Sequence, residues 1–518
     1  MAFKDLIGRK INSPNLLLGM AFLAGCFLRF VPGILTNFPV NDGGMILTMI
    51  RDLRSNGFLL PVVTTYNDFN IPFAYPPFGM YAAAFLNSQL SVSEFELLRW
   101  LPPLISSATI LAFYWLTRQI LNSESKAVIA AMLYALLPGS FEWLIMGGGL
   151  TRSFGILFSL LAIGYVHRLF SDDAGKKTIT LATLFSALTV LSHPEVGLQT
   201  AAICFVVWIF YGRNILGMKN AIFVALGIAL LTAPWWMTVL YYHGFLPFQS
   251  AIQTGVRETL IASLFHTFFS TQAGLPLLPV FSLVGLFIVV RKRGFFLILW
   301  AFLPFFIDPR NSPAIAIFPL LMISSEGLYH VYNEFVRASS QTFPKSEAAS
   351  KYVSIAAQAS LVLLALYLFL ASYVALPNLA AISLTDSDLE TMKWVRNHTL
   401  LESRFLLMTN RGNISPMTDA YQEWFPTLAE RRSQNTLQGL EWILGSNFFP
   451  YSQKLVDLQA CSDVDCLNSW LAENNIQVDY ILCYKRRAPQ GLINSLQADS
   501  RYGIVYESTN AMIFMVLP

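Results

Sequence analysis

Residues 38–81 read FPVNDGGMILTMIRDLRSNGFLLPVVTTYNDFNIPFAYPPFGMY and follow the first long apolar run of the chain. This stretch is too polar to cross a membrane. Its first charge, Asp42, lies directly after the apolar run, between Asn41 and a Gly-Gly pair. A carboxylate at a bilayer edge is costly unless it binds a metal or a proton donor, or takes part in catalysis. The stretch therefore predicts a functional loop centred on Asp42, with an ordinary helix-capping Asp as the alternative.

An amphipathic helix is predicted next in this loop, because apolar residues recur at positions 45, 46, 49, 50 and 53. Arg51, Asp52 and Arg54 fall on the other side of that helix, where we expect Asp52 to be solvated. An extended polar piece then leads to a Tyr-Pro-Pro sequence at 75–77.

The composition indicates a polytopic membrane protein. Of the 518 residues, 55% are hydrophobic and 13% are charged, and the mean hydropathy is +0.52. Soluble proteins average about 25% charged residues. The net charge of +3 is too small to suggest nucleic-acid binding. Since about 20 apolar residues span a bilayer, eleven spans are predicted, at 15–37, 100–118, 127–145, 153–170, 178–192, 196–212, 220–240, 275–290, 294–308, 313–333 and 353–376.

The orientation depends on the segment 75–90, which is apolar but shorter than a span and contains Pro76 and Pro77. If it does not cross, the Lys and Arg clusters between the spans all fall on one side, as cytoplasmic loops require. We therefore expect 75–90 to lie along the outer interface or to form a re-entrant helix. The amino terminus is then cytoplasmic, and the carboxyl-terminal region is outside.

Residues 377–518 differ in composition and predict a compact extracytoplasmic α/β domain, after a membrane domain at 1–376 with its first external loop at 38–98. An amphipathic helix is expected at 386–398, a helical stretch at 465–474, and strands at 403–408, 478–484 and 503–507. Cys461 and Cys466 flank a short acidic turn and predict a local disulfide if this region is outside the cytosol. The segments around Glu423-Trp424 and Glu441-Trp442 suggest either a sugar-binding platform or packing at the membrane face.

The order of these features resembles the first external loop of the GT-C class of integral-membrane glycosyltransferases. This class includes the protein O-mannosyltransferases, the aminoarabinose transferases and, more distantly, the oligosaccharyltransferases. Its pattern is an acidic residue after helix one, an amphipathic helix, and an aromatic or basic residue before Pro-Pro. The resemblance continues through 92–95 (VSEF) and 99–102 (RWLP), and so covers about the first 120 residues.

This resemblance implies a plasma-membrane enzyme that takes a sugar from a polyprenyl-phosphate donor and passes it to a lipid, glycan or protein acceptor at the outer face. Asp42 would then be the general base, or a metal ligand that positions the acceptor. Tyr75, Arg152 and Arg310 are the candidates for binding the donor and its phosphate. An interfacial anchor is the alternative role for Arg310.

A divalent cation such as Mg, Mn or Zn is a further expectation, with His193, Glu195 and Glu142 as the candidate ligands. His193-Pro194 can also simply break a helix and cap its neighbour. Members of the class often place a second acidic residue near the start of the fourth span, whereas the corresponding stretch here reads GGGLTRSFG at 147–155 and has no carboxylate. Arg152 would then neutralise the phosphate without a metal.

Two other functions compete with the enzyme. A transporter or flippase of lipid-linked glycans should show inverted repeats and charges near the bilayer midplane. A non-catalytic scaffold would use only an external sugar-binding domain. The predicted polar residues gather at one membrane face, which favours the enzyme. Nucleotide-driven chemistry is not expected, because the glycines at 147–149 lack the Lys-Ser/Thr of a phosphate-binding loop.

Overall fold

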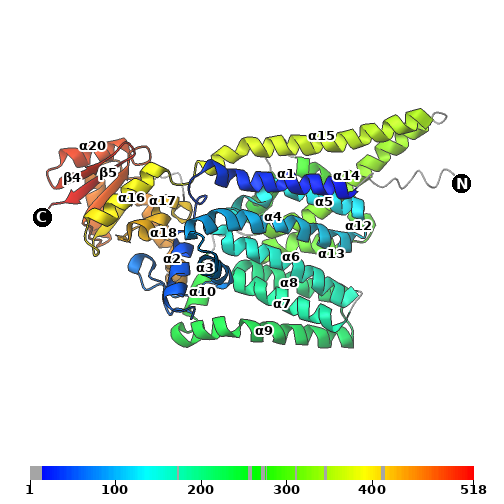
Figure 1. Ribbon diagram of the computed structural model, residues 1–518, viewed down its shortest axis with the longest axis horizontal. Helices are drawn as coiled ribbons and strands as arrows, with labels where there is room; N and C mark the ends of the chain where they lie inside the picture. Colours follow the sequence, from blue (N-terminus) through cyan, green and yellow to red (C-terminus); the bar gives the residue numbers. More distant parts are fainter. Residues whose placement is uncertain are drawn as a thin grey trace.

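A bundle of long helices and a small α/β domain at one end of it form the protein (Figure 1). The computed structural model describes residues 14–171, 174–254, 259–269, 275, 277–309, 312–342, 347–409 and 415–517. The predicted phosphate ligand Arg310 lies outside the described residues.

Each of the eleven predicted spans overlaps a helix in the described residues. These helices are α1 (Pro14–Leu35), α4 (Glu94–Leu121), α5 (Glu124–Leu136), α6 (Gly149–Ser171), α7 (Lys176–Ser192), α8 (Pro194–Tyr211), α9 (Ile215–His243), α12 (Leu277–Arg291), α13 (Phe295–Ile307), α14 (Ser312–Thr342) and α15 (Glu347–Ala380). Helix α5 covers the span predicted at 127–145 only as far as Leu136. By length and composition, seven helices among the described residues could cross a membrane, or eight if α5 is joined to its bent continuation. Helices α12 and α13 are apolar but shorter, so the number eleven stays a prediction.

Shorter helices lie between the bundle and the domain (Figure 1). They are α2 (Gly44–Ser55), α3 (Phe78–Leu90) and α10 (Leu246–Gln253), while α11 (Leu260–Phe269) packs against α14. Helix α3 covers most of the segment 75–90 and has 13 residues, so it is too short to count as a span. This length agrees with the prediction that the segment does not cross.

A buried arginine fixes the sharp bend after α5, where the chain turns by 95° toward the Asp42 loop. Arg29 of α1 is fully buried and donates hydrogen bonds to the carbonyl oxygen of Ala135 (2.9 Å) and to Ser106 Oγ (3.1 Å). The last carbonyl groups of a helix have no partner within the helix. Arg29 supplies a hydrogen-bond donor to one of these carbonyl groups at the end of α5, and so stabilises the turn that leads into residues 138–148.

The α/β domain contains a five-stranded sheet with the order β2-β1-β3-β5-β4. Its strands are β1 (Arg404–Met408), β2 (Arg432–Ser433), β3 (Tyr480–Tyr484), β4 (Tyr502–Glu507) and β5 (Ala511–Val516). Strands β2, β1 and β3 are parallel, whereas β5 runs antiparallel to both β3 and β4. The three predicted strands are confirmed, and β2 and β5 were missed.

The helices of the domain cover both faces of the sheet. Alternate residues along each strand point to opposite faces and pack against different helices. One face buries Leu406 and Ile481 with α18 (Phe448–Gln459), α19 (Val464–Glu473) and α20 (Gln490–Ala498). The other face buries Phe405 and Leu482 with α16 (Asp386–His398) and α17 (Ala420–Ala429). The predictions of α16 and α19 from local periodicity are confirmed.

The face covered by α16 and α17 shares one hydrophobic core with the first loop. Ile50 and Leu53 of α2 are fully buried in the same cluster as Trp424 and Phe425 of α17. Burying apolar surface is the main favourable term in folding and association. The α/β domain is therefore docked on residues 38–98 through a continuous core.

The prediction that Asp52 is solvated is wrong, because its side chain is buried. Its carboxylate accepts hydrogen bonds from Thr64 Oγ1 (2.6 Å), Thr65 Oγ1 (2.7 Å) and the Thr65 amide (3.0 Å). Helix α2 is enclosed on more than one side, so its polar residues need partners from within the protein. Asp52 therefore holds the extended piece of the loop against α2.

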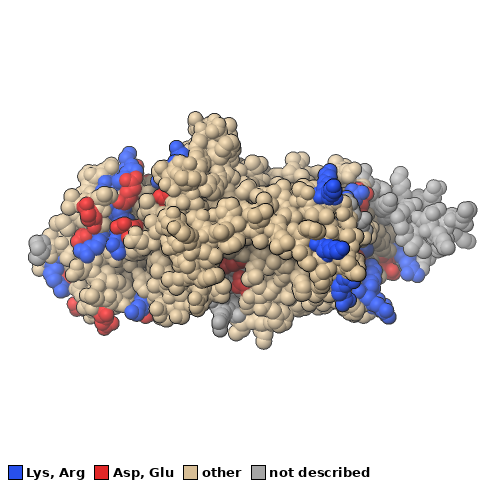
Figure 2. Space-filling model, turned by 90° about the horizontal axis from the view of Figure 1, so that it is seen from below, with Lys and Arg blue, Asp and Glu red and all other residues tan. Residues whose placement is uncertain are grey.

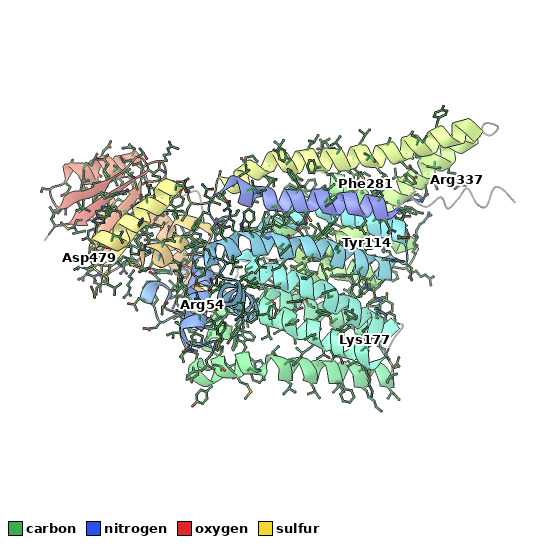
Figure 3. All side chains as sticks on the ribbon, in the orientation of Figure 1. Arg54, Tyr114, Lys177, Phe281, Arg337 and Asp479 are labelled. Atoms are coloured by element: carbon green, nitrogen blue, oxygen red, sulfur yellow. A yellow bond between two sulfur atoms is a disulfide. The ribbon has the colours of Figure 1, made fainter. Side chains whose placement is uncertain are left out.

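The surface charges divide the molecule into three zones. A broad uncharged belt separates the charged α/β domain from Lys and Arg side chains at the opposite end (Figure 2). Lys177 and Arg337 lie at that opposite end, far from Asp479 of the domain (Figure 3). Basic residues favour the cytoplasmic side of a membrane. The arrangement fits the predicted orientation, which stays a prediction.

Labelling of single cysteines from outside the cell tests this orientation. A membrane-impermeant maleimide should react with cysteines introduced at the exposed positions Asn56 and Glu430, and should not react at the exposed positions Lys177 and Arg293. Unsubstituted protein serves as the background control. Reaction at Lys177→Cys together with protection at Glu430→Cys would show that the map is inverted.

The predicted disulfide between Cys461 and Cys466 is present in the structure. We expect intact protein, analysed by mass spectrometry without reduction, to show neither cysteine alkylated. Replacing both with Ser should lower the stability of the domain by about 2 kcal/mol, as chain entropy predicts for so short a loop. Cys483 is a matched control, since it is a buried free cysteine of the same domain. Two free thiols at 461 and 466 would contradict the assignment.

Candidate functional site

Asp42 lies against the glycines at 147–149, where there is no room for side chains. Its Oδ1 atom accepts a hydrogen bond from the Gly148 amide (3.0 Å), and the Gly147 amide donates to the carbonyl oxygen of Val40 (2.9 Å). A Cβ atom added at Gly148 would lie 2.7 Å from Asp42 Oδ2. The three glycines at 147–149 therefore allow the backbone before α6 to approach the carboxylate closely.

Helix α6 places positive charge beside this carboxylate. It begins at Gly149, so the partial positive charge of its first turn lies next to Asp42. Arg152 is in the same turn and is close enough for its charge to act on Asp42. Burial raises the pKa of Asp42, while Arg152 and the Gly148 amide oppose that rise. The balance leaves a carboxylate that is more basic than an exposed one.

Arg152 is held in place and remains partly accessible. Its Nη1 atom donates to the carbonyl oxygen of Trp143 (2.8 Å), and its guanidinium lies 5.5 Å from the centre of the Trp143 ring. A guanidinium has five N–H donors. Arg152 can therefore offer a planar pair of donors to an anion at this site.

Tyr75, in the first loop, contacts the same first turn of α6. Its hydroxyl lies 3.2 Å from Thr151 Oγ1, and its ring meets those of His193 and Trp442 edge to face, with centroid distances of 6.1 and 5.9 Å. Burial raises the pKa of Tyr75 to about 12, although the charge of Arg152 opposes this shift. Tyr75 therefore stays protonated near neutral pH and can donate a hydrogen bond.

The three predicted metal ligands are not gathered into one ligand set. His193 is buried at the break between α7 and α8, as the helix-break alternative predicts, and Glu195 in the first turn of α8 raises the pKa of Tyr75. Glu142 lies in the short 3₁₀ helix Glu142–Leu144. In the described part of the chain, no group of three or more His, Cys, Asp and Glu side chains is placed to hold a metal ion.

The α/β domain contributes carboxylates that the sequence analysis did not assign to the site. Glu423 accepts hydrogen bonds from the amides of Gly43 (3.1 Å) and Met45 (3.4 Å), directly after Asp42. Burial first, and then the charge of Asp42, raise the pKa of Glu423 to about 8. The charge of Glu441 acts on Glu423 and also on Tyr75. Both residues come from segments that were singled out as unusual.

The two tryptophans of these segments are packed inside the protein. Trp424 is fully buried and Trp442 is 4% exposed. The Trp424 ring packs edge to face against Phe38 with a centroid distance of 4.5 Å. Packing, rather than an open sugar platform, therefore explains both side chains in this structure.

The site thus joins a basic carboxylate, a guanidinium and a protonated phenol at the end of the bundle next to the α/β domain. Arg54 marks the level of the first loop, between the bundle and the domain (Figure 3). Such a set can accept a proton, neutralise an anion and donate a hydrogen bond at one end of α6.

No protein-family model and no curated protein matches the chain. Solved structures do match. The oligosaccharyltransferase AglB from Archaeoglobus fulgidus, in complex with an inhibitory peptide and a dolichol-phosphate, has a TM-score of 0.56 and 14% identity, covering 100% of this chain and 75% of AglB. ArnT from Cupriavidus metallidurans, in the apo state, has a TM-score of 0.58 and 14% identity, covering 96% of this chain and 97% of ArnT.

The arabinofuranosyltransferase AftD from Mycobacteria has a TM-score of 0.55 and 13% identity over 98% of this chain, which spans 40% of AftD. Another structure of the Archaeoglobus fulgidus enzyme is a complex with Zn and sulfate. All of these proteins are GT-C glycosyltransferases. The resemblance drawn from the first loop is therefore confirmed at the level of the fold.

Proposed function

We propose that this protein is an integral-membrane glycosyltransferase that moves a sugar from a polyprenyl-phosphate donor to an acceptor at the extracytoplasmic face. The main support is that Asp42 and Tyr75 are hydrogen-bonded to Gly148 and Thr151 at the start of α6, where Arg152 also lies, in a GT-C fold. The dolichol-phosphate in the AglB complex supports a lipid phosphate as the donor chemistry.

Asp42 is the general base in this proposal. It takes the proton of an acceptor hydroxyl as the acceptor oxygen bonds to the anomeric carbon of the donor. The bond from that carbon to the phosphate oxygen breaks, and its electron pair leaves with the phosphate. A single displacement of this kind inverts the anomeric configuration. The raised pKa of Asp42 suits the role, because a base is most effective when its pKa lies near the working pH.

Arg152 neutralises the leaving phosphate, and the Tyr75 hydroxyl adds a hydrogen bond. The charge of Arg152 acts on both Asp42 and Tyr75, which shows that the three groups are close together. Preorganised donors aimed at developing charge are usually the largest single contribution to catalysis. Arg310 stays a candidate second phosphate ligand.

A divalent cation stays a prediction for this enzyme. The described side chains do not offer three grouped ligands, so we route no step through a metal. The acceptor class also stays open among lipids, glycans and proteins, although the peptide in the AglB complex shows that a related fold binds a protein segment.

Replacing the base tests the reaction. We expect Asp42→Asn to lower sugar transfer by roughly 10²- to 10⁴-fold, because Asn has a similar shape and cannot accept the proton. The assay measures transfer from polyprenyl-phosphate sugars by purified protein in liposomes. Asp68→Asn is the matched control, since Asp68 is exposed in the same loop. Wild-type transfer by Asp42→Asn would reject the base. Movement of a lipid-linked glycan across vesicles without any transfer would support the transporter.

Replacing Arg152 tests its proposed role in neutralising the leaving phosphate. We expect Arg152→Gln to lower kcat/KM for the donor by roughly 10²- to 10³-fold, as removal of one donor to developing charge does elsewhere. The kcat/KM of Arg152→Lys should lie between the values of the wild type and Arg152→Gln, since Lys keeps the positive charge and loses the planar pair of donors. Arg54→Gln is the control, because Arg54 pairs with Glu94 on the loop surface. Equal activity of Arg152→Gln and Arg54→Gln would contradict the assignment.

A further inference from the structure

Helix α2, which follows Asp42, has no N-terminal cap of its own. Its N-cap residue is Gly43, with a φ of 132° and no side chain to accept a hydrogen bond. The Glu423 side chain of the α/β domain supplies the missing acceptor, because one of its oxygens takes the amides of both Gly43 and Met45. The first amide groups of a helix need such partners. Here the partner comes from a residue 380 positions away.

Two more side chains of α17 hold the carbonyl groups of the same loop. Trp424 Nε1 donates to the carbonyl oxygen of Asn41 (2.7 Å), and Thr427 Oγ1 donates to that of Gly44 (2.7 Å). Trp424 and Thr427 are both buried. One turn of α17 therefore fixes the backbone on both sides of Asp42.

We propose that α17 is a positioning device for the Asp42 loop and that Glu423 is its central residue. This inference rests on the proposed function of Asp42. By holding the peptide groups on either side of Asp42, α17 sets the direction of the carboxylate toward the acceptor. The α/β domain is thus a part of the catalytic centre. A misplacement of about 1 Å in a reacting group can cost roughly 10²-fold in rate.

The protonation state of Glu423 makes Gln a close substitute for it. Burial first, and then the charges of Asp42 and Glu441, raise the pKa of Glu423 to about 8. This raised pKa favours the neutral form of Glu423. An amide oxygen can accept the same two backbone hydrogen bonds as the neutral carboxyl. Gln should therefore preserve positioning, whereas Ala should abolish it.

The experiment compares Glu423→Ala with Glu423→Gln in the full-length protein at pH 7. We expect Glu423→Ala to lower kcat by roughly tenfold to 100-fold, with KM for the donor changed by less than about threefold, because the loop moves and the phosphate ligand Arg152 does not. Glu423→Gln should restore kcat to within about threefold of the wild type. Hydrogen exchange of the amides at 43–47 should be faster in Glu423→Ala only.

Asp463→Ala is the matched control, because Asp463 caps α19 on the opposite face of the sheet from α17. It should lower the melting temperature without changing kcat or exchange at 43–47. Equal kcat in Glu423→Ala and Asp463→Ala, or a Gln variant as impaired as the Ala variant, would overturn the proposal.

Two further outcomes distinguish a failure of the positioning role from a failure of the proposed function. If the wild type transfers no sugar, the proposed function fails, and hydrogen exchange alone judges the positioning role; unchanged exchange in Glu423→Ala would reject it. If Glu423→Ala does not accumulate, Trp424→Phe and Thr427→Val remove single hydrogen bonds from the same turn and undergo the same measurements. Wild-type kcat and exchange in both would likewise reject it.

Discussion

The hydrogen bonds from α17 to the backbone around Asp42 are the constraint on which the rest of the site depends. A buried amide or carbonyl group without a partner costs about 1–3 kcal/mol. The loop after α1 cannot meet this need alone, since Gly43 and Gly44 carry no polar side chains. Glu423, Trp424 and Thr427 meet it from the α/β domain. The loop and the domain therefore require each other, and their common hydrophobic core follows from that contact.

Features that depend on neighbours in sequence could be predicted from the sequence. The helix 386–398 is amphipathic over its whole length and coincides with α16. Cys461 and Cys466 are separated by five positions, and a disulfide was expected from that spacing. Asp42 stood out because it is the first charge after an apolar run. In each case a short segment contains the physical reason for the structure.

The features that could not be predicted from the sequence depend on contacts between segments that are distant along the chain. Asp52 looked like a solvated residue because helical periodicity places it opposite the apolar stripe, yet Thr64 and Thr65 fold back over it. Strand β2 has only two residues, and β5 is a mostly buried run without alternation, so neither gives a clear signal. Glu423 was noticed as part of an unusual segment, but only the fold brings it to Asp42.

The balance of charge in the pocket bears on how an anionic donor could enter it. Asp42, Glu195, Glu423 and Glu441 all act on one another or on Tyr75, while Arg152 is the cation that acts on both Asp42 and Tyr75. Four ionised carboxylates would repel a phosphate, since like charges interact strongly where water is scarce. The raised pKa of Glu423 favours its protonated form, which removes one of these charges beside Asp42. A neutral Glu423 can hold the loop through its oxygen without adding negative charge, so positioning of the base and admission of the phosphate become compatible in one site.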